Sequence, residues 1–149
     1  MNTTNVIRAL NQAVRLEHAA TLQYRHQGLV LRGLFRQVYR SFFFDSAEEA
    51  GKHARKFGQK IVALGGEPTT EVGPVTHHHE LVEMLEADLA LERQALDAYR
   101  QALVHAEGDV ALTNMLEDQI QSEQEDVEEL ELILAEATEA KASRPRAAS

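Results

Sequence analysis

Apolar side chains recur every three to four residues over most of the chain, which is the spacing of amphipathic helices. Four such tracts cover residues 5–31, 36–64, 77–106 and 109–137. They are rich in Ala, Leu, Glu, Gln and Arg, which favour helix, and the first three end close to glycines. We expect a cap at Thr4 or Asn5 for the first helix and at Asp109 for the fourth. The pattern therefore predicts an all-α protein with four long helices.

The connections between these helices differ in length, and their lengths predict how the helices are arranged. The turns near Arg32–Leu34 and Gly108–Asp109 are short, so helices one and two, and helices three and four, form antiparallel pairs. The middle connection, EPTTEVGPVT, has no helical pattern and is long enough to cross the bundle from end to end. The predicted fold is a four-helix bundle over residues 1–138, with one long crossover between helices two and three. Residues 139–149 have no apolar periodicity, and we expect a disordered tail.

Each predicted helix carries one carboxylate near the middle of its apolar stripe: Glu17, Glu49, Glu92 and Glu123. His53 lies on the stripe of the second helix, one turn after Glu49. An unpaired carboxylate in a low-dielectric interior is very costly, and four carboxylates at one depth also repel one another. Because no Lys or Arg lies beside them on these stripes, two divalent cations are the expected counter-charge.

The two halves of the chain repeat this arrangement. Tyr24 follows Glu17 by seven residues, and Tyr99 follows Glu92 by the same interval. The alternative is that each carboxylate lies on a misjudged helix face and points to solvent, which would require the same error on all four helices. We therefore predict a di-metal site. Oxygen donors with one imidazole suit iron or manganese, and a chain without cysteine has no thiolate for a structural zinc site.

Composition and charge restrict the remaining functions. The chain has 149 residues, no cysteine and a formal net charge of −9. Residues 1–75 have a charge balance of +4 and residues 76–149 a balance of −13, so the second half should attract cations and repel phosphates. No secretory signal is recognised at the N-terminus, and no apolar run approaches the ~20 residues that cross a bilayer. We expect a cytoplasmic protein with no membrane partner.

Three segments resemble the bacterioferritins of the ferritin-like superfamily: LEHAATLQY in the first helix, KHARKFGQKIVALGGEP in the second and VEMLEADLALE in the third. The resemblance extends over residues 6–135 and is loosest in the fourth helix. It implies an iron-storage ferroxidase, in which a di-iron centre in each subunit oxidises Fe(II) with O2 or peroxide. It also implies a hollow homo-oligomer of 12 or 24 chains that holds an iron mineral.

The resemblance assigns six residues to the metals: two terminal carboxylates, two bridging carboxylates and one further ligand for each ion. Glu17 and Glu92 are the terminal carboxylates, and Glu49 and Glu123 are the bridging carboxylates. His53 and Asp126 are the further ligands, one for each ion. Tyr24 is expected to hydrogen-bond a ligand or to supply an electron, whereas core packing is favoured for Tyr99. Asp88 is either an outer partner of the site or an exposed acid. Two iron ions per chain are expected, with manganese as the alternative metal.

The chain departs from the bacterioferritin pattern at three positions. The residue three before His53, where the family has its bridging Glu, is Ala50, and the nearest carboxylate is Glu49, four before. Asp126 occupies the position of the family's second His, so the predicted ligands are five carboxylates and one imidazole. Gly51 aligns with the Met that binds haem, and we therefore predict no haem.

Other functions stay open from the sequence. A DNA-protecting stress protein of the Dps type would use the basic tail residues Lys141, Arg144 and Arg146, but three positive charges are few against −9, and we do not expect DNA binding. A rubrerythrin-like or di-manganese protein that consumes peroxide is a second alternative, and a metal-free helical interaction protein is a third. His77–His79 are expected to open the third helix as a polar first turn, with iron entry as the functional alternative.

Overall fold

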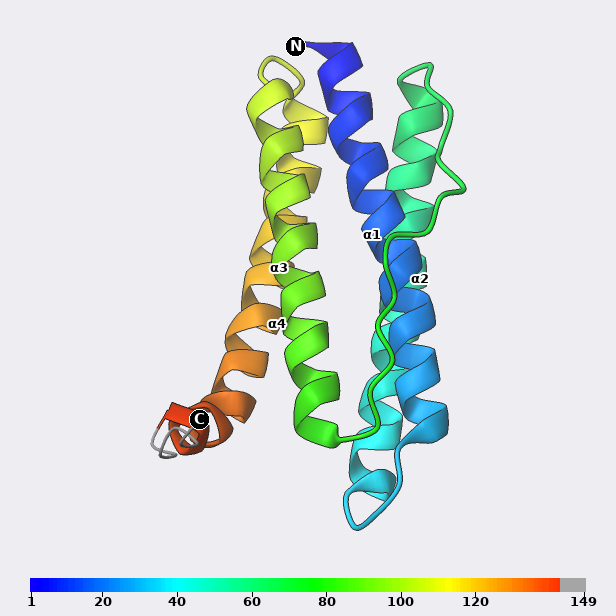
Figure 1. Ribbon diagram of the computed structural model, residues 1–149. Helices are drawn as coiled ribbons and strands as arrows, with labels where there is room; N and C mark the ends of the chain where they lie inside the picture. The colour runs from blue at the N-terminus through cyan, green and yellow to red at the C-terminus, as the bar shows by residue number, and fades with distance from the viewer. Residues whose placement is uncertain (143–149) are drawn as a thin grey trace, which may run out of the picture.

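The computed structural model describes the backbone of residues 1–142 and the side chains of residues 1–137. Its four α-helices are α1 (Thr3–Val30), α2 (Arg36–Ala63), α3 (Leu81–His105) and α4 (Val110–Ala142). α1 and α2 run antiparallel, as do α3 and α4, and a long connection leads from the end of α2 to the opposite end of the bundle (Figure 1). The described residues contain no β-strand. The predicted all-α four-helix bundle with one long crossover is confirmed.

The helix ends follow local capping chemistry. The Asn2 side chain caps α1 by accepting a hydrogen bond from the Asn5 backbone N–H at 3.0 Å, so the cap predicted at Thr4 or Asn5 was wrong. Asp109 caps α4 as predicted, because its carboxylate accepts from the Leu112 N–H at 3.0 Å. Such a cap contributes about 1 kcal/mol by satisfying an N–H that has no helical partner. The three glycines with positive φ lie in the turns just after α1, α2 and α3, where a left-handed backbone reverses the chain.

The crossover between α2 and α3 is an extended segment that follows α1. The Gly73 N–H donates to the Arg15 carbonyl at 3.1 Å, and the Thr76 N–H donates to the Gln23 side chain at 3.2 Å. Because these bonds hold the backbone against α1, α3 begins later than the sequence predicts. His77–His79 therefore lie in the crossover, and the expectation that they open the third helix was wrong.

The helices pack in a definite order that leaves one side of the bundle less closed. α1 packs against both α2 and α3, and α3 packs against α4. Among the described residues, no Cα atom of α2 lies within 8 Å of a Cα atom of α4. The side of the bundle between α2 and α4 is therefore closed by side chains alone, and the candidate site opens there.

The C-terminal end of the fold extends past the predicted boundary at residue 138. α4 continues to Ala142, and of the predicted tail 139–149 the last seven residues, 143–149, lie outside the described residues. Within residues 1–142, none of the helices combines the length and the apolar character that crossing a membrane requires.

Candidate metal centre

A cavity of about 310 Å³ opens between α2 and α4, near the middle of the bundle. α2 and α4 contribute most of its lining, and α1 and α3 supply the remaining side chains. The lining includes Tyr24 and all six predicted metal ligands: Glu17, Glu49, His53, Glu92, Glu123 and Asp126. The structure thus brings to one place every residue that the sequence analysis selected for the site.

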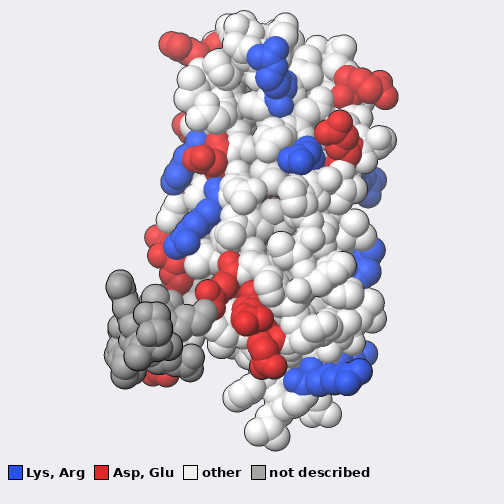
Figure 2. Space-filling view, in the orientation of Figure 1, with Lys and Arg blue, Asp and Glu red and all other residues white. Residues whose placement is uncertain are grey.

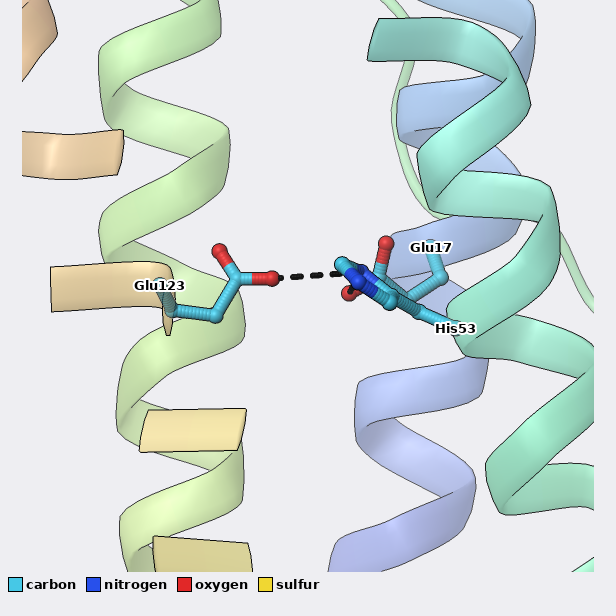
Figure 3. A group of neighbouring side chains, drawn as sticks. All are labelled: Glu17, His53 and Glu123. Atoms are coloured by element: carbon cyan, nitrogen blue, oxygen red, sulfur yellow. Dashed lines mark ion pairs between the residues drawn. The ribbon is translucent and has the colours of Figure 1, made fainter. Parts of the chain in front are cut away.

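One group of three potential ligands comes from three different helices (Figure 3). Glu17 of α1, His53 of α2 and Glu123 of α4 each offer one ligand atom, and these atoms lie within 4.8 Å of one another. His53 Nδ1 is 3.4 Å from Glu17 Oε1 and 3.4 Å from Glu123 Oε1. All three side chains are buried, so the group is largely removed from water.

A second group shares one member with the first. Glu92 of α3, together with Glu123 and Asp126 of α4, also offers three ligand atoms within 4.8 Å of one another. Glu92 is half-buried and Asp126 is exposed, so the second group lies closer to solvent than the first. Because Glu123 belongs to both groups, its carboxylate is placed where it could bridge two ions. Its Oε2 atom is buried without a hydrogen-bond partner, which leaves one oxygen free to bind a cation.

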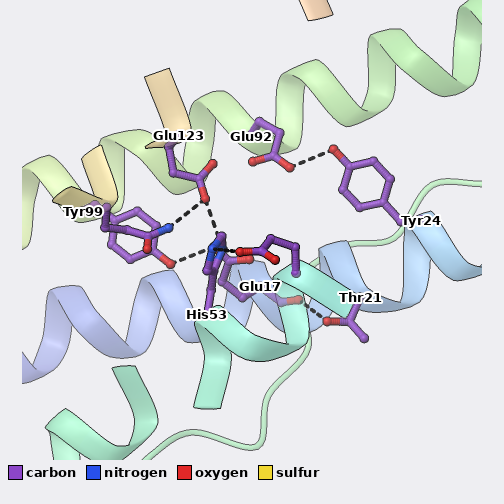
Figure 4. Close-up of polar contacts among 9 residues, drawn as sticks. Glu17, Thr21, Tyr24, His53, Glu92, Tyr99 and Glu123 are labelled. Atoms are coloured by element: carbon purple, nitrogen blue, oxygen red, sulfur yellow. Dashed lines mark hydrogen bonds and ion pairs between the residues drawn. The ribbon is translucent and has the colours of Figure 1, made fainter. Parts of the chain in front are cut away.

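Two tyrosines link the helices across the site (Figure 4). The Tyr24 hydroxyl donates to Glu92 Oε1 at 2.7 Å, and the Tyr99 hydroxyl donates to Glu17 Oε1 at 2.7 Å. The phenol of α1 therefore holds a carboxylate of α3, and the phenol of α3 holds a carboxylate of α1. The sequence analysis favoured core packing for Tyr99, and the centroid of its ring does lie 4.8 Å from that of the Phe57 ring. Its hydrogen bond to Glu17 is an additional role that the sequence did not show.

Burial and close contacts shift the pKa values of the ionisable groups at the site. Burial raises the pKa of Glu17 and, with its neighbour Glu123, raises the pKa of Glu92 well above 4.5. Burial also raises the pKa of Asp126, to about 6, and the charge of Glu92 adds to this effect. For His53, burial favours the neutral ring, but hydrogen bonds to Glu123 and Glu17 outweigh it and raise its pKa to about 10. A cation bound among these groups would compete with their protons, because the ligand atoms must be deprotonated to bind it.

Glu49 lines the cavity, but it is not buried in the core as the sequence analysis expected. Its side chain is 57% exposed, and the buried residue one turn before His53 is Ala50. Glu49 belongs to neither of the two ligand groups. Its Oε1 atom lies 3.2 Å from His53 Nε2, on the far side of the ring from the Nδ1 atom that faces Glu17. The expectation that Glu49 faces the core was wrong. Ala50 and Glu49 lie three and four residues before His53, and successive side chains on a helix point about 100° apart, so only Ala50 faces inward.

Several buried polar residues lie beside the site, and of these only Asp88 was identified from the sequence. Gln119 is buried, and its Nε2 atom donates to Glu123 Oε1 at 3.1 Å. Its position one turn before Glu123 on the same stripe was the available signal. Asp88 is completely buried, which rules out the exposed alternative, and it accepts a hydrogen bond from Gln23 Nε2 at 2.9 Å. Burial raises the pKa of Asp88 to about 7, while hydrogen bonds from Gln23 and Gln27 act in the opposite direction.

Comparison with known proteins places these features in a family. A sequence profile of the family described as Ferritin-like domain matches residues 7–140. A curated bacterioferritin of Desulfovibrio desulfuricans is 31% identical over 123 residues, which cover 80% of this chain and 68% of that protein. A crystal structure of ferritin-like, diiron-carboxylate proteins from Bacillus anthracis matches with a TM-score of 0.86 at 30% identity, over 90% of this chain and 98% of that one. These matches confirm the resemblance seen in the sequence, and the chain belongs to the ferritin-like family.

Proposed function

We propose that this chain is an iron-storage and iron-detoxifying ferroxidase, which binds two Fe(II) ions per subunit and oxidises them with O2 or peroxide. The observation that carries the proposal is the pair of ligand groups sharing Glu123 inside a single bundle. The relatives add support, since one is named a bacterioferritin and another is described as a diiron-carboxylate protein. Together, the cluster and these relatives favour a di-metal site.

The two groups suggest how the ions would be divided. Glu17 and His53 Nδ1 would hold one iron, Glu92 and Asp126 would hold the other, and Glu123 would bridge them. We assign Glu49 to orient His53 through Nε2, because its carboxylate lies on that side of the ring. This assignment replaces the bridging role that the sequence predicted. A partner on the second ring nitrogen fixes the orientation of a metal-binding imidazole.

The donor set fits iron chemically. Four carboxylates and one imidazole form a hard, anionic set, which suits Fe(II) and Mn(II) better than softer ions. When bound, the two irons supply the electrons that reduce O2 or peroxide. The residues of the chain then have three tasks: the carboxylates neutralise the ions, His53 gives up its proton to bind, and Tyr24 keeps Glu92 in place through its 2.7 Å hydrogen bond.

A hollow homo-oligomer of 12 or 24 chains is part of the proposal. Large apolar side chains are exposed together near the turn between α1 and α2: Leu29, Leu34, Phe35 and Val38. Apolar groups of this kind are more often covered by another subunit than left in water. Light scattering coupled to size-exclusion chromatography would give the number of chains, and a monomer would contradict the shell.

The alternatives are less well supported. In Dps-type proteins the metal sites lie between subunits, whereas both ligand groups here come from one chain. On the face shown in Figure 2, the Lys and Arg side chains lie apart and are interspersed with Asp and Glu, which does not favour DNA binding. A peroxide-consuming di-manganese protein would use similar ligands. Metal analysis of protein purified without added iron would distinguish it.

Anaerobic titration with Fe(II), followed by mixing with air-saturated buffer, tests the main proposal. We expect binding to saturate near two Fe(II) per chain and oxidation to be much faster than in protein-free buffer. The variant Glu17→Gln removes one ligand charge from the first group and should lower the stoichiometry. Absence of saturable binding, or binding without faster oxidation, would contradict the proposal.

A further inference from the structure

The three consecutive histidines of the crossover face three different neighbours. The ring of His77 lies 4.6 Å from the ring of His26 on α1, between centroids. His78 Nδ1 lies 3.5 Å from Glu83 Oε2, near the beginning of α3. His79 lines a separate cavity beside the turn between α1 and α2. The three imidazoles therefore do not form one ligand set, and among the described side chains His77 is the one of the three whose ring contacts a second histidine.

The position of His77 is fixed by the residue before it. The Thr76 N–H and the Thr76 hydroxyl both donate to Gln23 Oε1, each at 3.2 Å. Gln23 is buried in α1, and its Nε2 atom donates to Asp88 Oδ1 of α3 at 2.9 Å. His26 follows Gln23 by three residues, which places it on the same side of α1, where the crossover continues from Thr76. The contact between the two imidazoles thus depends on a buried anchor and not on two freely moving side chains.

The geometry and the exposure of this histidine pair suit a metal ion from solution. His26 is half-buried and His77 is exposed, so an ion can reach both rings. Their planes are inclined at 35° and converge along one edge. A divalent ion binds an imidazole nitrogen at about 2.0–2.1 Å, so two nitrogens that share an ion lie at most about 4 Å apart. Because the exposed ring of His77 can turn about its side-chain bonds, a nitrogen of each ring can come within this span.

We propose that His26 and His77 bind one divalent ion of the imidazole-preferring class, Cu(II), Ni(II) or Zn(II), and thereby clamp the crossover onto α1. Water completes the coordination, because the pair is open to solvent. The affinity of a nitrogen site increases from Mn(II) through Fe(II) and Ni(II) to Cu(II), and imidazole also suits Zn(II). The pair therefore selects different ions from the candidate metal centre, which has several carboxylates and a single imidazole, His53.

The ion would stabilise the docked state of the crossover. Besides the bond from Thr76 to Gln23, the Gly73 N–H donates to the Arg15 carbonyl at 3.1 Å, so the backbone is held on α1 by a few hydrogen bonds. The two imidazoles belong to different segments and meet only while the crossover is docked. An ion that binds both imidazoles stabilises that state alone. The clamp is independent of the proposed function, since it uses none of the residues assigned to iron.

Pulsed EPR of Cu(II) tests the site directly in the full-length, metal-free chain. The method detects the remote ring nitrogens of bound imidazoles and so counts the imidazoles on each ion. With Cu(II) added below one equivalent, we expect a signal from two imidazoles. The candidate metal centre can supply only His53, so such a signal cannot come from it. A signal from a single imidazole in the unmodified chain would overturn the proposal.

Four variants identify the histidines that bind the ion. His26→Asn and His77→Asn should each abolish the two-imidazole signal and leave the circular dichroism spectrum unchanged, since neither side chain is buried. His78→Asn and His79→Asn are the matched controls from the same tract and should retain the signal. Retention of the signal in His26→Asn would show that the histidine tract binds Cu(II) by itself, and its loss in either control would show a different ligand set. Either result would overturn the pair.

A titration with Fe(II) separates this proposal from the ferroxidase. Under anaerobic conditions, His26→Asn should bind as many Fe(II) ions as the unmodified chain. A lower stoichiometry in the variant would overturn the claim that the pair is a separate site. Conversely, failure of the unmodified chain to bind Fe(II) would contradict the ferroxidase and leave the two-imidazole signal as the test of the clamp.

Hydrogen–deuterium exchange tests the clamping itself. The relevant amides are those of Gly73 and Thr76, which are bonded to α1 and exchange when the crossover opens. With Zn(II) at about 100 times its dissociation constant, opening that releases the ion should become about 100-fold rarer, and exchange of these amides should slow by the same factor. In His77→Asn, Zn(II) should leave their exchange unchanged. Equal slowing in the two proteins would show that the ion acts elsewhere and would overturn the clamp.

Discussion

The variant Glu123→Gln is the most informative perturbation of the candidate metal centre. Glu123 is the one residue shared by the two ligand groups, so the substitution weakens both at once, whereas Glu17→Gln affects only the first. Glutamine has nearly the same shape as glutamate and keeps an oxygen that can accept the 3.1 Å hydrogen bond from Gln119. The change therefore removes the charge and the bridging geometry with little effect on packing.

The expected rise in melting temperature follows from the number of Fe(II) ions that the folded chain binds. A ligand present at 100 times its dissociation constant stabilises the folded state by about 2.7 kcal/mol per site, so two ions would contribute roughly 5 kcal/mol. For a domain of this size, 1 kcal/mol shifts the melting temperature by roughly 2–4 °C. We therefore expect anaerobic Fe(II) to raise the melting temperature of the unmodified chain by about 10–20 °C. Glu17→Gln should keep about half of that shift, and Glu123→Gln should lose most of it.

Circular dichroism melts under anaerobic conditions, with and without Fe(II), measure these shifts directly. Glu128→Gln is the matched control, because Glu128 is an exposed glutamate of the same helix, α4, and its loss removes the same charge. The metal-free variants should show the same helical content as the unmodified chain. If Fe(II) stabilises Glu123→Gln as strongly as it stabilises the unmodified chain, the shared carboxylate does not bridge two ions, and the assignment of both groups is wrong.

Three further predictions concern the surrounding residues. Asp88→Asn should stabilise the metal-free protein at pH 8.5, because the folded-state pKa of Asp88 is raised from 3.8 to about 7 and the cost of ionising it grows as pH rises between these values. The gain, on the order of 4 kcal/mol at most, should vanish near pH 4 in urea unfolding measured across this range, and a gain that is the same at all pH values would show a packing effect instead. Glu49→Gln should still bind two Fe(II) per chain in an anaerobic titration, since glutamine can accept the bond from His53 Nε2, whereas a stoichiometry of one would restore Glu49 as a bridging ligand. Tyr99→Phe and Tyr24→Phe should each slow iron oxidation in stopped-flow measurements, and an unchanged rate in Tyr99→Phe would reduce that residue to core packing.

The local features of this protein could be predicted from the sequence alone. Apolar periodicity placed all four helices, because a helix that buries one face must repeat apolar residues at its own pitch. The same periodicity placed Glu17, Glu92 and Glu123 on the stripes that the structure buries or half-buries. The connection lengths indicated antiparallel pairs with a long crossover. These conclusions depend only on residues close together in the chain, so one sequence was sufficient for them.

The tertiary structure decided which side chains meet. The hydroxyl of Tyr99 reaches Glu17 across 82 residues of sequence, and no local pattern specifies such a pairing. Periodicity also cannot distinguish neighbouring positions at the edge of a helix face. For that reason the sequence analysis placed Glu49 in the core, although Ala50 is the buried residue. The tilt and rotation of each helix against its neighbours determine which edge position faces inward. Those rotations result from packing the whole core at once, and only the folded chain contains that information.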